Sequence, residues 1–154
     1  MRTIHSPSKA FTFASFAALI VGVAAYLVGL FNATMQLNEK GYYLTVLLFS
    51  LFAAVAVQKS VRDNIEGVPV TRAFYLMSWA ALLCAIGLFS TGLYNAELLL
   101  SEKGFYAMAY TLALFAAVTA QKNIRDKAAT CAEESSHEHL DTSAEQVYQP
   151  PHAE

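Results

Sequence analysis

The stretch GLFNATMQLNEKGYY (29–43) returns 63 residues later as GLYNAELLLSEKGFY (92–106), and this doubling decides the fold. Aligned without a gap, the segments 11–63 and 74–126 share 23 identical residues. Each copy places one short polar loop between two long apolar runs. The repeat therefore predicts two tandem units of two helices each.

The composition favours a membrane protein over a small soluble domain. The chain of 154 residues is 56% hydrophobic and 14% charged, whereas about 25% of the residues in soluble domains are charged. The long apolar runs contain no Asp, Glu, Lys or Arg and no polar stripe every 3.6 residues. A hydrocarbon core of about 30 Å needs about 20 helical residues. We therefore expect four membrane spans, near 11–31, 42–57, 74–94 and 105–120.

The distribution of Lys and Arg predicts the orientation of these spans. Eight of the ten basic residues precede the first span, lie between the second and third, or follow the fourth. The other two, Lys40 and Lys103, lie in the polar loops. By the positive-inside rule, both termini and the linker are cytoplasmic and the two loops face outside. The repeats then run in the same direction, which predicts a pseudo-two-fold axis along the membrane normal.

The expected fold is an all-α membrane protein with four transmembrane helices, arranged as two tandem, parallel-repeat helical hairpins. Gly67 and Pro69 break the helical pattern between the hairpins. The tail carries six acidic residues and no Lys or Arg, which predicts a disordered cytoplasmic segment. The expected parts are a cytoplasmic lead (1–10), a first two-helix repeat (11–66), a cytoplasmic linker (67–73), a second two-helix repeat (74–127) and the acidic tail (128–154).

Each polar loop carries an Asn followed by Glu-Lys-Gly. The residues are Asn32, Glu39, Lys40 and Gly41 in the first copy, and Asn95, Glu102, Lys103 and Gly104 in the second. In a structural interpretation the Asn turns the chain, the Glu-Lys pair neutralises the loop and the Gly supplies backbone freedom. The alternative is a paired extracytoplasmic cation site, formed by the two glutamates across the pseudo-two-fold axis. The adjacent lysines and the lack of nearby His or Cys favour the structural interpretation, so we expect no metal.

A second motif, Gln-Lys-x-x-Arg-Asp, ends each repeat. Its residues are Gln58, Lys59, Arg62 and Asp63, and again Gln121, Lys122, Arg125 and Asp126. On a continuing helix, the Lys and Asp of each copy are four residues apart, so we expect a local ion pair that anchors the topology. The alternative is a docking patch for a soluble partner or for anionic lipid.

The apolar spans carry no ionisable Asp, Glu, Lys, Arg or His, which argues against pumps and ion-coupled transporters. No Walker loop, nucleophile elbow, HExxH motif or paired-cysteine zinc spacing occurs in the sequence. We therefore expect no enzyme, no catalytic residue and no cofactor. Two function classes stay open: a non-enzymatic scaffold or envelope-associated factor, and a small oligomeric channel or facilitator for a neutral or hydrophobic solute.

The expected partners are membrane lipids, further copies of the chain and a cytoplasmic or membrane protein, and no nucleic acid. The hydroxyl side chains of the spans distinguish the two function classes. A channel needs them along one continuous path, whereas a scaffold buries them singly. These residues are Ser15, Thr45, Ser50, Ser78, Ser90, Thr91, Thr111 and Thr119.

The two motifs together, GL[FY]NA…EKG[YF]Y and LFAAV…QKxxRD, closely resemble the bacterial YiaA/YiaB inner-membrane protein family. The resemblance covers about residues 11–127, and the two tandem two-helix units match the YiaA members. It implies a multi-pass protein of the bacterial inner (cytoplasmic) membrane. It implies no activity and no catalytic residues.

Overall fold

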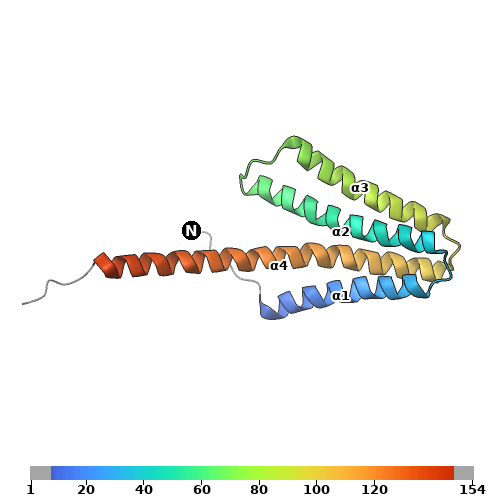
Figure 1. The fold of residues 1–154 in the computed structure, drawn as a ribbon, viewed down its shortest axis with the longest axis horizontal. Helices are drawn as coiled ribbons and strands as arrows, with labels where there is room; N and C mark the ends of the chain where they lie inside the picture. Colours follow the sequence, from blue (N-terminus) through green and yellow to red (C-terminus); the bar gives the residue numbers. More distant parts are fainter. Residues whose placement is uncertain (1–7, 148–154) are drawn as a thin grey trace, which may run out of the picture.

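The computed structural model describes residues 8–147, and these form four helices with no strand among them. The helices run side by side along the molecule (Figure 1). Each contains a stretch long and apolar enough to cross a membrane. The all-α fold and the four expected spans are therefore confirmed. The helices are α1 (Lys9–Asn32), α2 (Leu37–Ile65), α3 (Arg72–Asn95) and α4 (Leu100–Val147).

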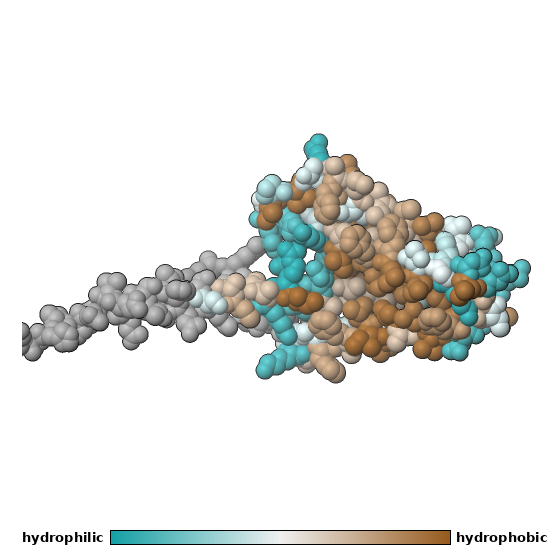
Figure 2. All heavy atoms as spheres, in the orientation of Figure 1, coloured by the Kyte–Doolittle hydropathy of each residue, from teal (hydrophilic) through white to brown (hydrophobic). Residues whose placement is uncertain are grey.

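The surface of the bundle carries a broad apolar band with hydrophilic residues at both ends (Figure 2). Among the exposed apolar side chains of the described residues, Phe13 is 77% exposed, Phe52 73% and Phe115 71%. Such a continuous apolar surface is far larger than soluble monomers display. Helices α1 and α3 have 24 residues each and are therefore about 36 Å long, sufficient to cross a hydrocarbon core of about 30 Å.

The two repeats are interlocked rather than merely adjacent. Helix α1 packs mainly along α4, and α2 packs mainly along α3, as Figure 1 also shows. Helices α2 and α4 meet in the centre, whereas α1 and α2, which belong to one repeat, contact each other much less. The first helix of each two-helix unit thus finds its main neighbour in the second helix of the other unit.

The backbones of the two repeats approach each other closely at Gly22. A Cβ atom there would lie 2.9 Å from the backbone nitrogen of Ala113 and 3.1 Å from its Cα. Gly92 also excludes a side chain, because a Cβ atom would lie 2.7 Å from Cε1 of Tyr42. Small residues let membrane helices pack closely by van der Waals contact. The glycines therefore hold helices of different repeats together.

An aromatic cluster fills the centre of the bundle, where all four helices contribute. Tyr26 is fully buried and meets Tyr106 edge-on at a ring distance of 5.7 Å. Phe89 and Tyr110 are stacked, with ring centroids 3.8 Å apart. The Tyr26 hydroxyl donates a hydrogen bond to the backbone carbonyl of Tyr43 at 3.2 Å. The Tyr110 hydroxyl also donates, to the hydroxyl of Ser50 at 2.6 Å, so the cluster supplies apolar contact together with buried hydrogen bonds.

Helix α4 departs from the sequence expectation at its end. It continues for 48 residues to Val147, so the part of the acidic tail between 128 and 147 is helical and not disordered. This part contains no Pro or Gly and is rich in Ala and Glu, which are strong helix formers. The rest of the tail and most of the N-terminal lead lie outside the described residues.

Candidate functional sites at the two ends of the bundle

At the loop end, the glutamate of each loop motif lies in the first turn of a helix and caps that helix. A Glu39 carboxylate oxygen accepts a hydrogen bond from the backbone N–H of Gln36 at 2.9 Å. Glu102 does the same for the N–H of Leu99, also at 2.9 Å. The first N–H groups of a helix have no partner within the helix, so these carboxylates satisfy one donor each.

The lysines of the loop motif close the other side of each turn. The Lys40 ammonium donates to the carbonyl of Phe31 at 2.9 Å, and Lys103 donates to the carbonyl of Tyr94 at 2.9 Å. These carbonyls lie in the last turns of α1 and α3, where acceptors lack helical partners. Glu and Lys thus bind the backbone of their own repeat instead of simply neutralising each other.

The remaining loop residues have different roles from one another. The Asn32 side chain donates to the carbonyl of Val28, and Asn95 donates to that of Thr91, both at 2.8 Å. Gly41 lies inside a helix, its φ is not positive, and a Cβ atom there would meet nothing within 4 Å. Its equivalent in the second repeat lies inside α4, also without a positive φ, and a Cβ atom there would also meet nothing within 4 Å. The backbone freedom that we expected of these glycines is therefore not used.

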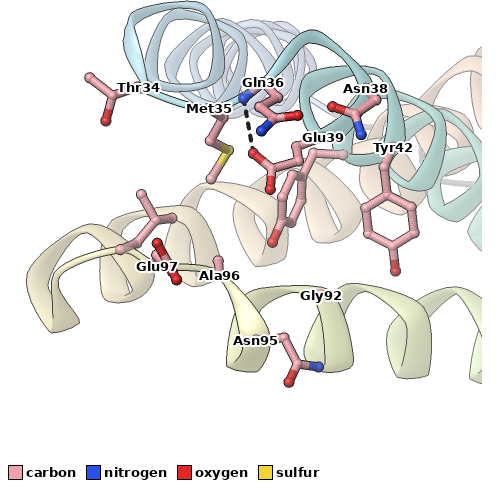
Figure 3. A pocket seen from close by; sticks show the side chains of 12 residues that line it. Thr34, Met35, Gln36, Asn38, Glu39, Tyr42, Gly92, Asn95, Ala96 and Glu97 are labelled. Atoms are coloured by element: carbon pink, nitrogen blue, oxygen red, sulfur yellow. Dashed lines mark hydrogen bonds between the residues drawn. The ribbon is translucent and has the colours of Figure 1, made fainter.

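Glu39 and Glu102 lie in two different cavities, so the paired cation site is not formed. The larger cavity, called here the loop cavity, has a volume of about 620 Å³ and lies between the start of α2 and the end of α3 (Figure 3). A smaller cavity of about 340 Å³ lies at the pseudo-equivalent place between α1 and α4. Among the described residues, no group of three His, Cys, Asp or Glu side chains could hold a metal ion. The loop cavity is lined by Thr34, Met35, Gln36, Asn38, Glu39, Tyr42, Tyr43, Gly92, Asn95, Ala96, Glu97 and Leu98.

At the opposite end, called here the linker end, the Arg and Asp residues join the two repeats. Arg62 Nη1 lies 3.2 Å from Asp126 Oδ1, and Arg125 Nη2 lies 3.2 Å from Asp63 Oδ1. The two ion pairs are reciprocal across the pseudo-two-fold axis. Glu66 has no counterpart in the second repeat, and it pairs with Arg62 and, at 3.8 Å, with Arg125.

The local Lys–Asp ion pair that we expected is not formed in the described part of the chain. Asp63 and Asp126 instead pair with arginines of the other repeat, whose guanidinium groups suit carboxylates well. Lys59 and Lys122 are exposed, and neither forms an ion pair with any described residue. The two lysines are therefore left as free positive charges on the outer surface.

The glutamines of the second motif lie beside these charges and are partly buried. The Oε1 atom of Gln58 is buried and has no hydrogen-bond partner among the described residues. Gln58 lines a cavity of about 610 Å³ with Trp79 and Lys122. Gln121, its counterpart, does not line this cavity. The two repeats thus differ at the linker end.

A buried polar contact between α1 and α4 was not predicted. The amide of Asn123 donates to the hydroxyl of Ser15 at 2.9 Å, and both side chains are buried. The residues are 108 positions apart, so no local pattern joins them. One feature of the sequence pointed to this contact: the residue after Gln-Lys in the repeated motif is polar in both copies, Ser60 in the first and Asn123 in the second.

Comparison with known proteins agrees with the duplicated architecture. The model of the yiaA/B two helix domain matches the chain twice, at 11–63 and 74–126. Over 123 residues the chain is 52% identical to "Inner membrane protein YiaA" of Escherichia coli (strain K12), covering 80% of this chain and 85% of that protein. Over 58 residues it is 41% identical to "Uncharacterized membrane protein YubF" of Bacillus subtilis (strain 168), covering 37% of this chain and 67% of that protein. No solved structure gives a significant match.

Proposed function

The chain belongs to the yiaA/B two-helix domain family and is a membrane protein, and from this premise we propose that it is a non-enzymatic scaffold of the inner membrane. In this proposal the linker end and both termini face the cytoplasm, as the distribution of Lys and Arg indicates. The linker end docks a cytoplasmic or membrane protein partner, and the apolar band contacts lipid.

The observation that carries the proposal is the pair of reciprocal ion pairs between the repeats. Arg62 with Asp126 and Arg125 with Asp63 tie the ends of α2 and α4 together. The arginines and aspartates are thereby engaged inside the protein, while the lysines of the same motif remain free. A fixed surface with exposed positive charge is suited to an acidic partner, because complementary charge guides association.

Helix α4 adds a second element at this end. It projects well beyond the other three helices on the side of the linker (Figure 1). A helix of 48 residues is about 72 Å long, more than twice the thickness of the hydrocarbon core. In the proposed orientation this projection extends the scaffold into the cytoplasm.

The span hydroxyls favour the scaffold over the channel. Ser15, Ser50 and Ser78 are buried, and each donates to the carbonyl one turn earlier in its own helix at 2.6 to 2.8 Å. The exposed hydroxyls of Thr111 and Thr119 in α4 also donate to the carbonyl one turn earlier. Each of these hydroxyls thus donates to its own backbone, and those of Ser15 and Ser50 also accept a buried side-chain hydrogen bond. A water-filled path needs instead polar groups that line one continuous channel.

A charge-removal experiment tests the scaffold. Lys59→Gln/Lys122→Gln removes the two free lysine charges of the Gln-Lys-x-x-Arg-Asp motifs at the linker end, and Lys40→Gln/Lys103→Gln removes an equal charge at the loop end. We expect crosslinking in intact cells, followed by mass spectrometry, to lose defined partner crosslinks in the first variant and to retain them in the second. An unchanged set of crosslinks in the first variant, at equal protein level, would contradict partner docking at this end.

The channel is tested separately by reconstitution. Liposomes that contain the purified chain are loaded with a panel of neutral solutes, and efflux is compared with that of empty liposomes. The scaffold proposal expects equal rates. A solute whose efflux rises with the protein-to-lipid ratio would instead support the channel.

A further inference from the structure

We propose that the loop cavity is a binding site for an organic cation that carries an ammonium group. The inference concerns the end of the bundle opposite to the proposed docking surface and does not depend on it. Three independent properties carry the proposal: the charge of the cavity, the unpartnered hydroxyl of a buried tyrosine and the size of the cavity.

The charge of the cavity wall is negative. Two carboxylates, Glu39 and Glu97, line it, and no Lys, Arg or His does. Glu39 uses one oxygen to cap α2, which leaves the other available. Glu97 is exposed and has no hydrogen bond or ion pair with any described residue. Lys40, the nearest basic residue along the chain, is directed to the carbonyl of Phe31 and is not part of the wall.

The unpartnered hydroxyl belongs to Tyr43. This side chain is 6% exposed and lines the cavity. Its hydroxyl makes no hydrogen bond to any described residue, and the oxygen itself is not enclosed, so a ligand in the cavity can reach it. A ligand with N–H groups would supply the missing donor, because a phenol oxygen accepts hydrogen bonds.

A second tyrosine completes an aromatic wall. The hydroxyl of Tyr42 donates to the carbonyl of Leu88 at 2.7 Å, which holds its ring in place. The Tyr42 and Tyr43 rings stand edge to face, with centroids 5.4 Å apart. Tyrosine faces attract ammonium groups through the ring quadrupole. Rings and carboxylates together therefore favour an ammonium over other polar groups.

The size and ligand atoms of the cavity favour an organic cation over a metal ion. A volume of about 620 Å³ falls in the range of about 300–1,000 Å³ typical of small-molecule sites. Calcium requires six to eight oxygen ligands at short distance, whereas the two carboxylates here come from the start of α2 and from the loop after α3, and the first of them already caps a helix. An ammonium needs only about three acceptors.

The pseudo-equivalent cavity provides an internal control. It keeps a glutamate and a tyrosine, Glu102 and Tyr106, but Phe105 stands where the loop cavity has Tyr42. Glu97 has Thr34 as its counterpart, so the smaller cavity lacks the second carboxylate. The smaller cavity should therefore bind an ammonium poorly.

Two sources could supply the ammonium: the ethanolamine headgroup of a lipid, or a soluble amine. The cavity is lined by residues of the loop end, and at that end of the bundle the apolar band gives way to hydrophilic residues (Figure 1, Figure 2). We therefore place the cavity at the level of lipid headgroups in a bilayer. Either source presents the same chemistry to the carboxylates and rings. The experiment below distinguishes them.

The test uses the full chain in nanodiscs, either of phosphatidylglycerol alone or of phosphatidylglycerol with phosphatidylethanolamine. Native mass spectrometry measures retained phosphatidylethanolamine, and calorimetric titration in the first discs measures ethanolamine and spermidine binding. Whichever ligand binds, we expect Glu97→Gln to raise its Kd about tenfold, since a lost interaction of about 1.4 kcal/mol corresponds to a tenfold change in affinity. Tyr43→Phe should weaken it less, and Glu102→Gln, in the control cavity, should leave it unchanged.

Each outcome decides the proposal. Retention of phosphatidylethanolamine identifies a lipid as the source, and titration by the amines identifies a soluble ligand. Absence of both with the wild-type chain overturns the site. Equal losses in Glu97→Gln and Glu102→Gln also overturn it, because they would reflect a general charge effect. Thermal melting of each variant confirms that the bundle remains folded.

Discussion

The two ends of the bundle use the same kinds of residue in opposite ways. At the loop end, Glu39 and Lys40 bind backbone groups within their own repeat. At the linker end, Arg62 and Asp63 bind side chains of the other repeat. Both arrangements occur twice in the chain. The loop end therefore defines each two-helix unit, and the linker end defines how two units combine.

At the linker end, equivalent segments of α2 and α4 meet, so adjacent Arg and Asp residues become self-complementary, as in an isologous dimer interface. At the loop end, the Glu and Lys side chains instead bond to the backbone next to them in the chain. The following substitutions test the distinction, from the largest expected effect to the smallest.

The largest loss of stability is expected from a substitution at Gly22, where the two repeats pack closely together. In Gly22→Leu the new side chain would meet the backbone of Ala113, and overpacking of this kind costs about 1–3 kcal/mol or more. The free energy of unfolding, measured by steric trapping in bicelles, should fall accordingly. Gly87→Leu is the matched control, since a Cβ atom there meets nothing within 4 Å. Similar losses in both variants would mean that the close approach of α1 and α4 is unimportant.

A double-mutant cycle at the linker end should reveal coupling between the repeats. Arg62→Gln and Asp126→Asn each remove one partner of a partly buried ion pair. We expect each to cost about 1 kcal/mol, and the pair to show a coupling energy of at least about 0.5 kcal/mol. The same unfolding assay measures all four proteins of the cycle. Strict additivity would show that the cross-repeat pair contributes nothing.

The loop end should give the opposite result. Glu39→Gln and Glu102→Gln each weaken one helix cap, at a cost of about 0.5–1 kcal/mol. Because each carboxylate acts within its own repeat, the loss of unfolding free energy in the double variant should equal the sum of the two single losses within about 0.5 kcal/mol. A coupling as large as that at the linker end would remove the contrast between the two ends.

The smallest effect is expected at the glycines of the loop motif. Gly41→Ala and Gly104→Ala should raise the free energy of unfolding by about 0.5 kcal/mol each, since alanine is the better helix former and no contact opposes it. Chemical unfolding in detergent compares each with the wild type. A clear loss of stability in either variant would show that the space beside that glycine is occupied in the membrane.

The sequence was sufficient for the number of spans and for the duplication. Long runs without charge and two aligned copies leave few other architectures open. It was not sufficient for the pairing of helices, because two equivalent units can bury the same small residues within a unit or between units. Gly22 fits a close contact in either case, and only the structure assigns it to Ala113.

The charged motifs show the same limit. Spacing along one helix places Lys59 near Asp63, so a local pair was the natural expectation. Nothing in the spacing indicates that Arg62 and Asp126 meet across the bundle. The loop cavity was also not predicted, because Glu97 and Tyr43 come from different repeats, and because Glu97 has Thr34 as its counterpart in the other copy.

The exchange of partners between the repeats has a consequence for synthesis of the nascent chain. Leu100, the first residue of α4, is made 68 residues after Asn32, the last residue of α1. At roughly 5–20 residues per second, α1 spends roughly 3 to 14 seconds in the membrane without its main neighbour. During that interval Gly22 and Ser15 are open to whatever the insertion machinery or lipid provides. The duplicated chain thus completes its bundle only when its last helix arrives.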